Sequence, residues 1–246
     1  MALEQRKRSC LDAMGVTVWE RRALASCNPQ SVVGAAVSTA SAAREAAPRS
    51  ADVVSPAAAS EADLLALEQI VNGCVRCELH ATRKQTVFGV GAANARLMII
   101  GEAPGADEDR VGEPFVGRAG RLLNAMLLAI GLERERVYIA NIVKCRPPKN
   151  RDPKPEETAR CGEYLKRQIE LVAPKVILAA GRVAAQNVLG TTSAIGRLRG
   201  QVHRDPVSGT PVVVTYHPAY LLRSPAEKRK SWEDLKRAHR LLNETP

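Results

Sequence analysis

Four short apolar runs alternate along the chain with longer amphipathic segments. The apolar runs lie within 95–105, 137–144, 175–181 and 211–217. The amphipathic segments lie at 62–75, 121–132, 155–172, 181–190 and 224–244, the last of them expected to open at Ser224 and Pro225. Short apolar runs predict buried strands, and apolar residues at helical spacing predict helices. The alternation predicts an α/β domain, a three-layer sandwich with a mostly parallel central sheet flanked by helices.

The N-terminal quarter has a different pattern. Residues 31–60 contain 11 alanines and no aromatic residue. A segment of this composition buries too little apolar surface to offset the conformational entropy that the chain loses on folding. We therefore predict an Ala/Ser-rich flexible linker over 23–60 and a globular domain over 61–246. Residues 1–22 are either a frayed end or a peptide that docks on a replication or repair protein through Trp19. The stretch LDAMGVTVWERR faintly resembles the N-terminal peptide of the psi subunit of the bacterial clamp loader.

The charge balance narrows the class of partner. The chain has 36 Lys and Arg against 26 Asp and Glu, a net charge of +10, which favours a polyanionic partner without requiring one. No run approaches the roughly 20 apolar residues that cross a bilayer. The charged start, MALEQRKRSC, is not followed by the apolar core of a secretion signal. We expect a monomer in the cytoplasm, associated with the nucleoid and not with a membrane.

The chain has six cysteines: Cys10, Cys27, Cys74, Cys77, Cys145 and Cys161. The first two lie in the N-terminal quarter and are expected to be free thiols. Cys74 and Cys77 form a CxxC pair. Thioredoxin-like redox sites also use CxxC, but there the pair follows a strand, whereas here it follows a predicted helix. With Cys145 and Cys161 they make four thiolates, a set that suits structural zinc or an iron–sulfur cluster. Spacing hardly separates the two, although the wide gap before Cys145 favours a cluster.

Polar segments follow the predicted strands. Ligands of open α/β sheets bind beyond the carboxyl ends of the strands, so these segments predict a pocket at one sheet edge. The glycine-rich segment 101–123 lacks both the P-loop lysine and the dinucleotide-binding glycine pattern. Within it, Phe115 is either a core residue or a flat face for a planar ring. His217 is either a capped strand end or a group that stabilises developing negative charge.

These motifs together resemble one family. GEAPGADEDRVGEPFVGRAGRLL, NIVKCRPPKNRDPKPEE, HPAYLLR and the four cysteines resemble the family 4 uracil-DNA glycosylases, the iron–sulfur branch of their superfamily, over residues 61–243. The resemblance implies that the chain flips uracil out of DNA and hydrolyses its N-glycosidic bond, leaving an abasic site. It also implies a structural [4Fe–4S] cluster on Cys74, Cys77, Cys145 and Cys161. The alternatives are a non-catalytic DNA-binding or repair-associated module, or a glycosylase for another deaminated base.

The resemblance also assigns roles to the residues of the pocket. It implies that Phe115 stacks on uracil, Asn141 reads its edge and His217 stabilises the leaving anion. Backbone around Glu102, Ala103, Pro104 and Gly105 would line the rest of the pocket. The best-known uracil glycosylases have a water-orienting aspartate where this chain has Ala103. Glu102 is therefore expected to position the water, with Glu108 as a second candidate.

The resemblance finally implies contacts to DNA. Lys144 and Arg146 are expected to face DNA, together with the apolar and then basic loop that contains Leu221, Leu222 and Arg223. Leucines there would fill the space of the flipped base, and arginine would bind phosphate. A related branch traps the abasic site through a histidine after the asparagine, and residues 142–157 contain none. We therefore expect turnover by a monofunctional enzyme.

Overall fold

The structure is a computed structural model that describes residues 56–244, with side chains from residue 61 onward. The predicted partner-binding peptide 1–22 and most of the predicted linker lie outside the described residues. The domain begins earlier than predicted, because helix α2 spans Pro56–Asn72 and so includes the last five residues of the linker 23–60. Alanine is the best helix former, and proline is favoured at a helix start, so the segment PAAAS suits a first turn.

A six-stranded sheet forms the centre of the domain, in the order β1-β3-β2-β4-β6-β5. The strands are β1 Val90–Gly91, β2 Leu97–Gly101, β3 Tyr138–Asn141, β4 Val176–Ala180, β5 Val202–Arg204 and β6 Pro211–Thr215. The four central strands are parallel, and only the two edge strands pair antiparallel with their neighbours. The predicted mostly parallel sheet is confirmed.

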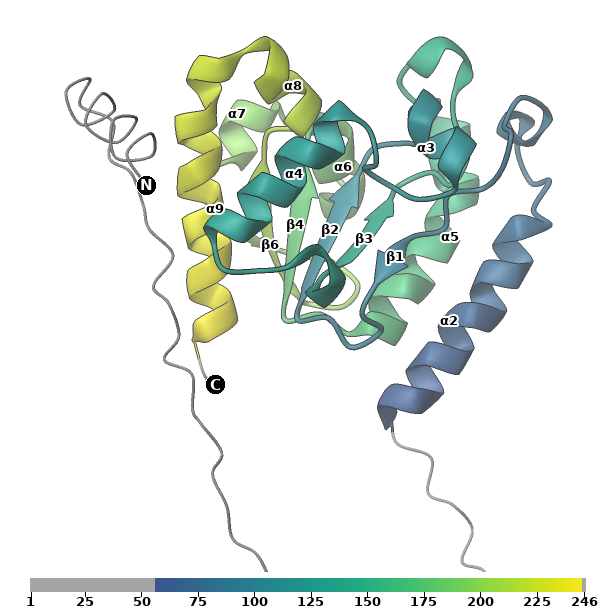
Figure 1. Cartoon of the computed structure of the whole chain (residues 1–246), viewed down its shortest axis with the longest axis horizontal. Coiled ribbons are helices and arrows are strands. Elements are labelled where there is room, and N and C mark those ends of the chain that lie inside the picture. Colours follow the sequence, from purple (N-terminus) through teal and green to yellow (C-terminus); the bar gives the residue numbers. More distant parts are fainter. Residues whose placement is uncertain (1–55, 245–246) are drawn as a thin grey trace, which may run out of the picture. The chain divides into compact units, whose positions relative to one another are not determined.

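Side chains of the central strands point alternately to two apolar layers. On β2, Met98 and Ile100 pack in one layer with α5 (Pro155–Val172) and α6 (Arg182–Leu189). Leu97 and Ile99 pack in the other with α4 (Arg118–Ala129) and α9 (Lys228–Asn243). Strands buried on both faces are apolar at every position. Figure 1 shows the helices on both faces of the sheet, which confirms the three-layer sandwich.

The last predicted helix, 224–244, is preceded by a short helix that the sequence pattern did not predict. A short helix α8 spans Pro218–Arg223, a 3-10 turn follows at Pro225–Glu227, and α9 begins only at Lys228. Ser224 ends α8 and is also the N-cap residue of the turn Pro225–Glu227, which leads directly into α9, so the opening predicted at Ser224 and Pro225 agrees with the structure. The residue before a proline is pushed out of the helical region, and Ser224 has φ −130° and ψ 72°. The segment predicted as a loop after His217 is therefore helical.

The sequence pattern missed the shortest elements. They are β1, β5, α3 (Ala106–Val111), α7 (Ile195–Leu198) and the 3-10 turns Glu78–Ala81, Arg134–Arg136 and Pro148–Asn150. Such elements are too short for a hydrophobic period to develop. Within the described residues, no helix has the length and apolar content to span a membrane.

Candidate active site

A cavity of about 420 Å³ lies where β2, β3 and β6 end. In Figure 1 this is the edge of the sheet at which α3 and α8 lie. All seven residues predicted to bind uracil line the cavity: Glu102, Ala103, Pro104, Gly105, Phe115, Asn141 and His217. The fold therefore brings together side chains from three separate parts of the sequence. Asn150 and Asp152, from the polar loop after β3, also line it, and the sequence analysis missed them.

Phe115 forms part of the cavity wall and has an unusual backbone conformation. Its φ is 54°, in the left-handed region, and the side chain is 6% exposed. Two glycines leave room for it: a Cβ at Gly120 would overlap the Phe115 carbonyl, and a Cβ at Gly101 would overlap the Phe115 ring and Asn141 Oδ1. Gly101 and Gly120 therefore allow close packing around the ring.

His217 stacks on Phe115, with ring centroids 5.4 Å apart and planes inclined by 28°. It caps α8, because its Nδ1 accepts a hydrogen bond from Ala219 N at 3.1 Å. Since Nδ1 accepts, the neutral ring carries its proton on Nε2. Burial, and then the nearby Arg223, lower the pKa of His217 to about 4, while Glu108 opposes the shift. At neutral pH the ring is therefore an uncharged donor.

Asn141 is the last residue of β3, paired in register with Gly101 of β2, and only 2% exposed. Its side-chain amide bonds to no other group in the described part of the chain. A buried amide without a protein partner is costly unless a ligand bonds to it. Asn141 thus offers one donor and one acceptor at fixed positions in the cavity wall.

Glu102 is the carboxyl group of the cavity with the most altered acidity. Burial, and then the nearby Asp152, raise its pKa to about 7, while Arg182 opposes the rise. Arg182 pairs with Asp152 at 2.5 Å. Glu102 therefore changes protonation near neutral pH, which suits a group that handles a proton.

Glu108 has a structural task instead of the predicted secondary role with water. Its Oε1 accepts hydrogen bonds from Val116 N at 3.0 Å and Gly117 N at 3.1 Å. Its Oε2 accepts from Gly105 N at 3.1 Å. Three backbone donors occupy the carboxylate, and the Gly105 N–H is no longer free to line the pocket as predicted.

Two predicted DNA contacts are wrong. Lys144 is 1% exposed, and its Nζ donates to Asn141 O at 2.9 Å and Gln168 Oε1 at 2.5 Å. Leu221 is also 1% exposed, because α8 turns it inward toward α4. A helix buries every third or fourth residue, whereas a loop would have presented all of them. Leu222 and Arg223 are exposed, and Arg146 is half-buried and donates to Asn150 Oδ1 at 2.8 Å.

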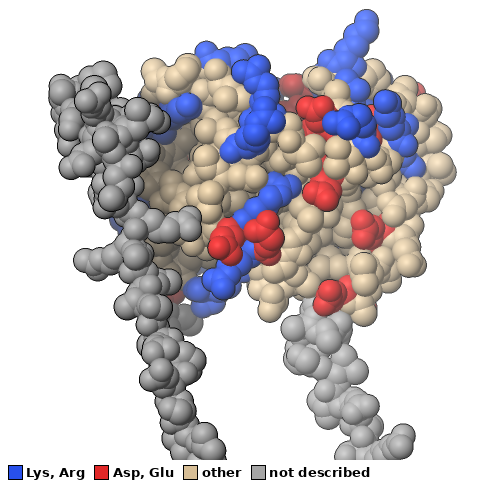
Figure 2. Space-filling model, in the orientation of Figure 1, with Lys and Arg blue, Asp and Glu red and all other residues tan. Residues whose placement is uncertain are grey.

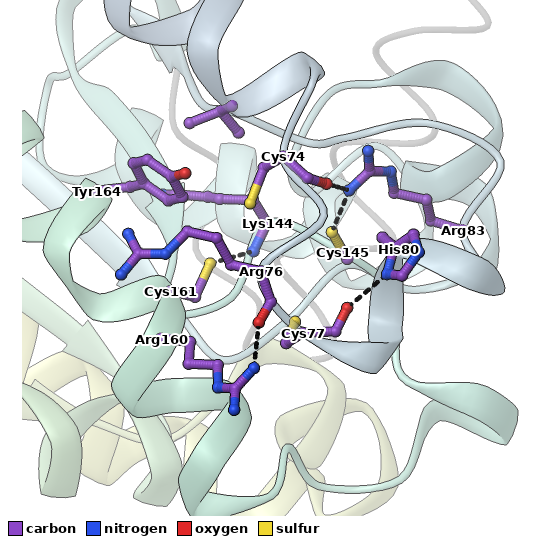
Figure 3. Close-up of a pocket in the computed structure, with 11 residues that line it drawn as sticks. Cys74, Arg76, Cys77, His80, Arg83, Lys144, Cys145, Arg160, Cys161 and Tyr164 are labelled. Atoms are coloured by element: carbon purple, nitrogen blue, oxygen red, sulfur yellow. Dashed lines mark hydrogen bonds between the residues drawn. The ribbon is translucent and has the colours of Figure 1, made fainter.

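The four cysteines surround a second, smaller cavity (Figure 3). Cys74 and Cys77 follow α2, Cys145 follows β3 and Cys161 lies in α5. None of the four is in a disulfide. Arg83 Nη1 donates to Cys145 Sγ at 3.1 Å and Cys74 O at 2.8 Å, and Lys144 N donates to Cys161 Sγ at 3.3 Å.

This donor set fits a multi-atom cluster. Among the described residues, no three His, Cys, Asp or Glu side chains converge closely enough to hold one metal ion. Both structural zinc and iron–sulfur clusters use four thiolates as ligands, and the four thiols here enclose a small cavity. Three arginines, one lysine and one histidine line the cavity, and no carboxylate does: Arg76, Arg83, Arg160, Lys144 and His80. They suit the negative charge of a group bound by four thiolates.

The comparison with known proteins decides the family. A model of the uracil DNA glycosylase superfamily matches residues 88–236. The type-4 uracil-DNA glycosylase of Archaeoglobus fulgidus is 46% identical over 173 residues, 68% of this chain and 87% of that protein. That of Thermotoga maritima is 45% identical over 171 residues, 68% of this chain and 88% of that protein. The chain belongs to the type-4 uracil-DNA glycosylases.

The comparison also distinguishes the type-4 enzymes from the type-5 uracil-DNA glycosylases. A type-5 uracil-DNA glycosylase of Pyrobaculum aerophilum is 36% identical over 149 residues, which cover 53% of this chain and 64% of that protein. The type-4 relatives are both more similar and more completely covered. The resemblance read from the motifs is thus confirmed.

Proposed function

We propose that this type-4 uracil-DNA glycosylase hydrolyses the N-glycosidic bond of uracil in DNA, releases free uracil and leaves an abasic site. The product would enter base-excision repair. The observation that carries the proposal is the meeting of Phe115, Asn141 and His217 in one cavity at the sheet edge. An aromatic face, an unpaired amide and a neutral histidine are what recognition and release of a flipped pyrimidine require.

Asn141 would select uracil. Its amide N–H can donate to uracil O4 while its carbonyl oxygen accepts from N3–H. Cytosine presents the opposite pattern, a donor at position 4 and an acceptor at N3, which would leave buried polar groups unpaired. Sites that depend on such hydrogen bonds reject the wrong partner strongly.

His217 would stabilise the leaving group. As the bond between C1′ and N1 breaks, negative charge develops on uracil, and Nε2–H would donate to O2. A hydrogen bond to an oxygen that gains charge strengthens in the transition state. Water then adds to C1′, and ionised Glu102 would position it and accept its proton. No amine nucleophile is needed for this sequence.

The surface around the cavity supports DNA binding. Figure 2 shows several Lys and Arg side chains along the upper part of the visible face, where α3 and α8 lie in Figure 1. Exposed Arg223 lines the cavity and would bind a phosphate, while Leu222, 36% exposed, could enter the base stack. We also propose that residues 1–22 bind a replication or repair protein, which a Trp19→Ala variant would test in a pull-down.

The four cysteines would hold a [4Fe–4S] cluster. Bound there, the cluster would join the end of α2 to β3 and α5, and so stabilise the fold without taking part in the chemistry. Iron, sulfide and zinc analysis of protein purified without oxygen tests this. Iron and sulfide in equal amounts are expected, and zinc alone would contradict the proposal.

The deciding experiment is uracil release from a labelled oligonucleotide with one uracil, in EDTA, followed by alkali to break abasic sites. Breakage only after alkali is expected. Asn141→Ala should lower the rate about 1,000-fold, because the base-reading bonds are lost, while DNA binding is kept. Asn243→Ala, at an exposed position in α9, is the control. An intact oligonucleotide would favour the non-catalytic module, and cleavage only of a hypoxanthine oligonucleotide would favour another base.

A further inference from the structure

The backbone of Phe115 needs to be held in place. A left-handed φ of 54° is rare for a bulky residue and costs free energy. This conformation places the ring against His217 and inside the cavity. If the segment 114–117 relaxed to an ordinary conformation, the ring would turn away from the position where it can stack on a base.

Two ionisable side chains form hydrogen bonds with the backbone of this segment, Glu108 with its N–H groups and Arg134 with its carbonyl groups. Glu108 accepts from the N–H groups that follow the ring, those of Val116 and Gly117, at 3.0 and 3.1 Å. Arg134, in the 3-10 turn before β3, donates to the carbonyls on the other side. Its Nη2 lies 2.5 Å from Pro114 O and its Nη1 lies 3.4 Å from Phe115 O.

The hydrogen bonds of Arg134 all go to neutral oxygen atoms. Asn124 of α4 holds it through Oδ1 at 3.2 Å. It makes no ion pair with any carboxylate among residues 61–244, although Glu113, Glu135 and Glu108 are near enough to act on it electrostatically. A half-buried guanidinium gives up hydration, and here neutral carbonyl oxygens replace the lost water. Its hydrogen bonds therefore go to backbone and Asn124, and serve the shape of the loop.

We propose that Glu108 and Arg134 are positioning residues that clamp the 114–117 segment and so aim the Phe115 ring at the flipped uracil. This inference rests on the proposed function for its catalytic consequence. Neither residue touches the reacting atoms in this role. The effect of Arg134 passes through the Phe115 segment, whereas Glu108 also holds Gly105 N of the cavity wall, so the kinetic test is made on Arg134.

The kinetic test is a double-mutant cycle. Arg134→Met should lower kcat/KM about 10- to 100-fold, since small misplacements of a binding group cost that much, and mainly through KM. Arg134→Lys, which keeps a donor, should recover part of the loss. In a Phe115→Ala background, Arg134→Met should change kcat/KM less than about twofold, because residues that act as one unit are not additive. Arg136→Met, exposed in the same turn, is the control. A full additional loss in the Phe115→Ala background would overturn the proposal.

A second test does not depend on glycosylase activity. The chain has two phenylalanines, Phe88 and Phe115, so 4-fluorophenylalanine labelling gives two fluorine resonances, assigned with Phe115→Leu. Arg134→Met and Glu108→Gln should shift or broaden the Phe115 resonance and leave that of Phe88, which is buried in the other core layer, unchanged. Two unchanged resonances, or equal changes in both, would overturn the clamp even if the parent released no uracil.

Discussion

Two cavities of the domain are held together in different ways: the uracil cavity, lined by Phe115, Asn141 and His217, and the cysteine cavity, lined by the four cysteines. Around the first, the chain supplies its own constraints: Glu108 and Arg134 on the Phe115 loop, and Ala219 on His217. Around the second, four sulfurs from three parts of the fold line a space and receive only two hydrogen bonds, from Arg83 and from Lys144 N. The first site is preorganised by the protein, whereas the second would depend on the cluster that we propose for it.

One short segment joins the two regions. Asn141 belongs to the uracil cavity and Cys145 to the cysteine cavity. Between them, Lys144 makes two hydrogen bonds. Its Nζ donates to the Asn141 carbonyl oxygen, and its backbone N–H donates to Cys161 Sγ. The two regions can therefore be tested for independence by changing one and measuring the other.

After Asn141→Ala, the largest effect on catalysis is expected at His217. His217→Ala should slow uracil release about 100- to 1,000-fold, the usual cost of removing one donor to a developing anion. DNA affinity should hardly change. Single-turnover rates check this, with His239→Ala, exposed on α9, as the control. A loss below a few-fold would remove His217 from the chemistry.

The next effect is a pH dependence at Glu102. Its pKa is raised to about 7, so the ionised form that accepts a proton exists mainly above pH 7 and is lost as pH falls through 7. Glu102→Gln should slow the reaction about tenfold at pH 8 and have little effect at pH 5.5, where the parent group is already protonated. Histidine 217 should stay neutral across this range, because its pKa is about 4.

A pH profile of kcat/KM between 5 and 9 checks this assignment. Asp152→Asn should move the acidic limb to lower pH, because Asp152 is one cause of the raised pKa of Glu102. A limb that survives in Glu102→Gln would assign it to another group.

Loss of the cluster should affect catalysis less than stability. Cys145→Ala should abolish iron binding and open the segment after α2 to trypsin at Arg76 and Arg83, since local regions unfold before the core. Uracil release at 20–25 °C should fall less than about tenfold if the preorganised cavity survives local opening. Complete loss of activity with an intact circular dichroism spectrum would show that Lys144 couples the two regions.

The smallest effect is expected at the rim of the cavity. Arg223→Gln should weaken DNA binding a few-fold and reduce the slope of log affinity against log salt by about one, as one phosphate contact is lost. The single-turnover rate at saturation should not change. Titrations at several KCl concentrations check this. An unchanged slope would place Arg223 away from phosphate.

The sequence pattern predicted the long elements well and the short ones poorly. The helix expected at 155–172 matches α5 to the residue, and each of the four predicted strands contains one of the parallel central strands. These elements bury enough apolar side chains to show their period in the sequence. The boundary at Ser224 and Pro225 lies where it was predicted, but α8 was predicted as a loop because six residues are too few to show a helical period.

The sequence alone also determined the chemistry available to the site. The resemblance of its motifs to the family named Phe115, Asn141 and His217, of which Asn141 ends β3 and His217 follows β6. The order of the strands could then bring the three together, since parallel strands end at one edge of the sheet.

Only the tertiary structure decided which of the polar side chains near those motifs are free to act. Lys144 and Leu221 looked exposed in the sequence, but burial against Gln168 and α4 removed both from the surface. Glu108 looked like a spare carboxylate, but three backbone N–H groups occupy it. The burial of Lys144 and Leu221 comes from segments distant in the chain, whereas the partners of Glu108 lie within nine residues of it and are brought to the carboxylate by the folded path of one loop.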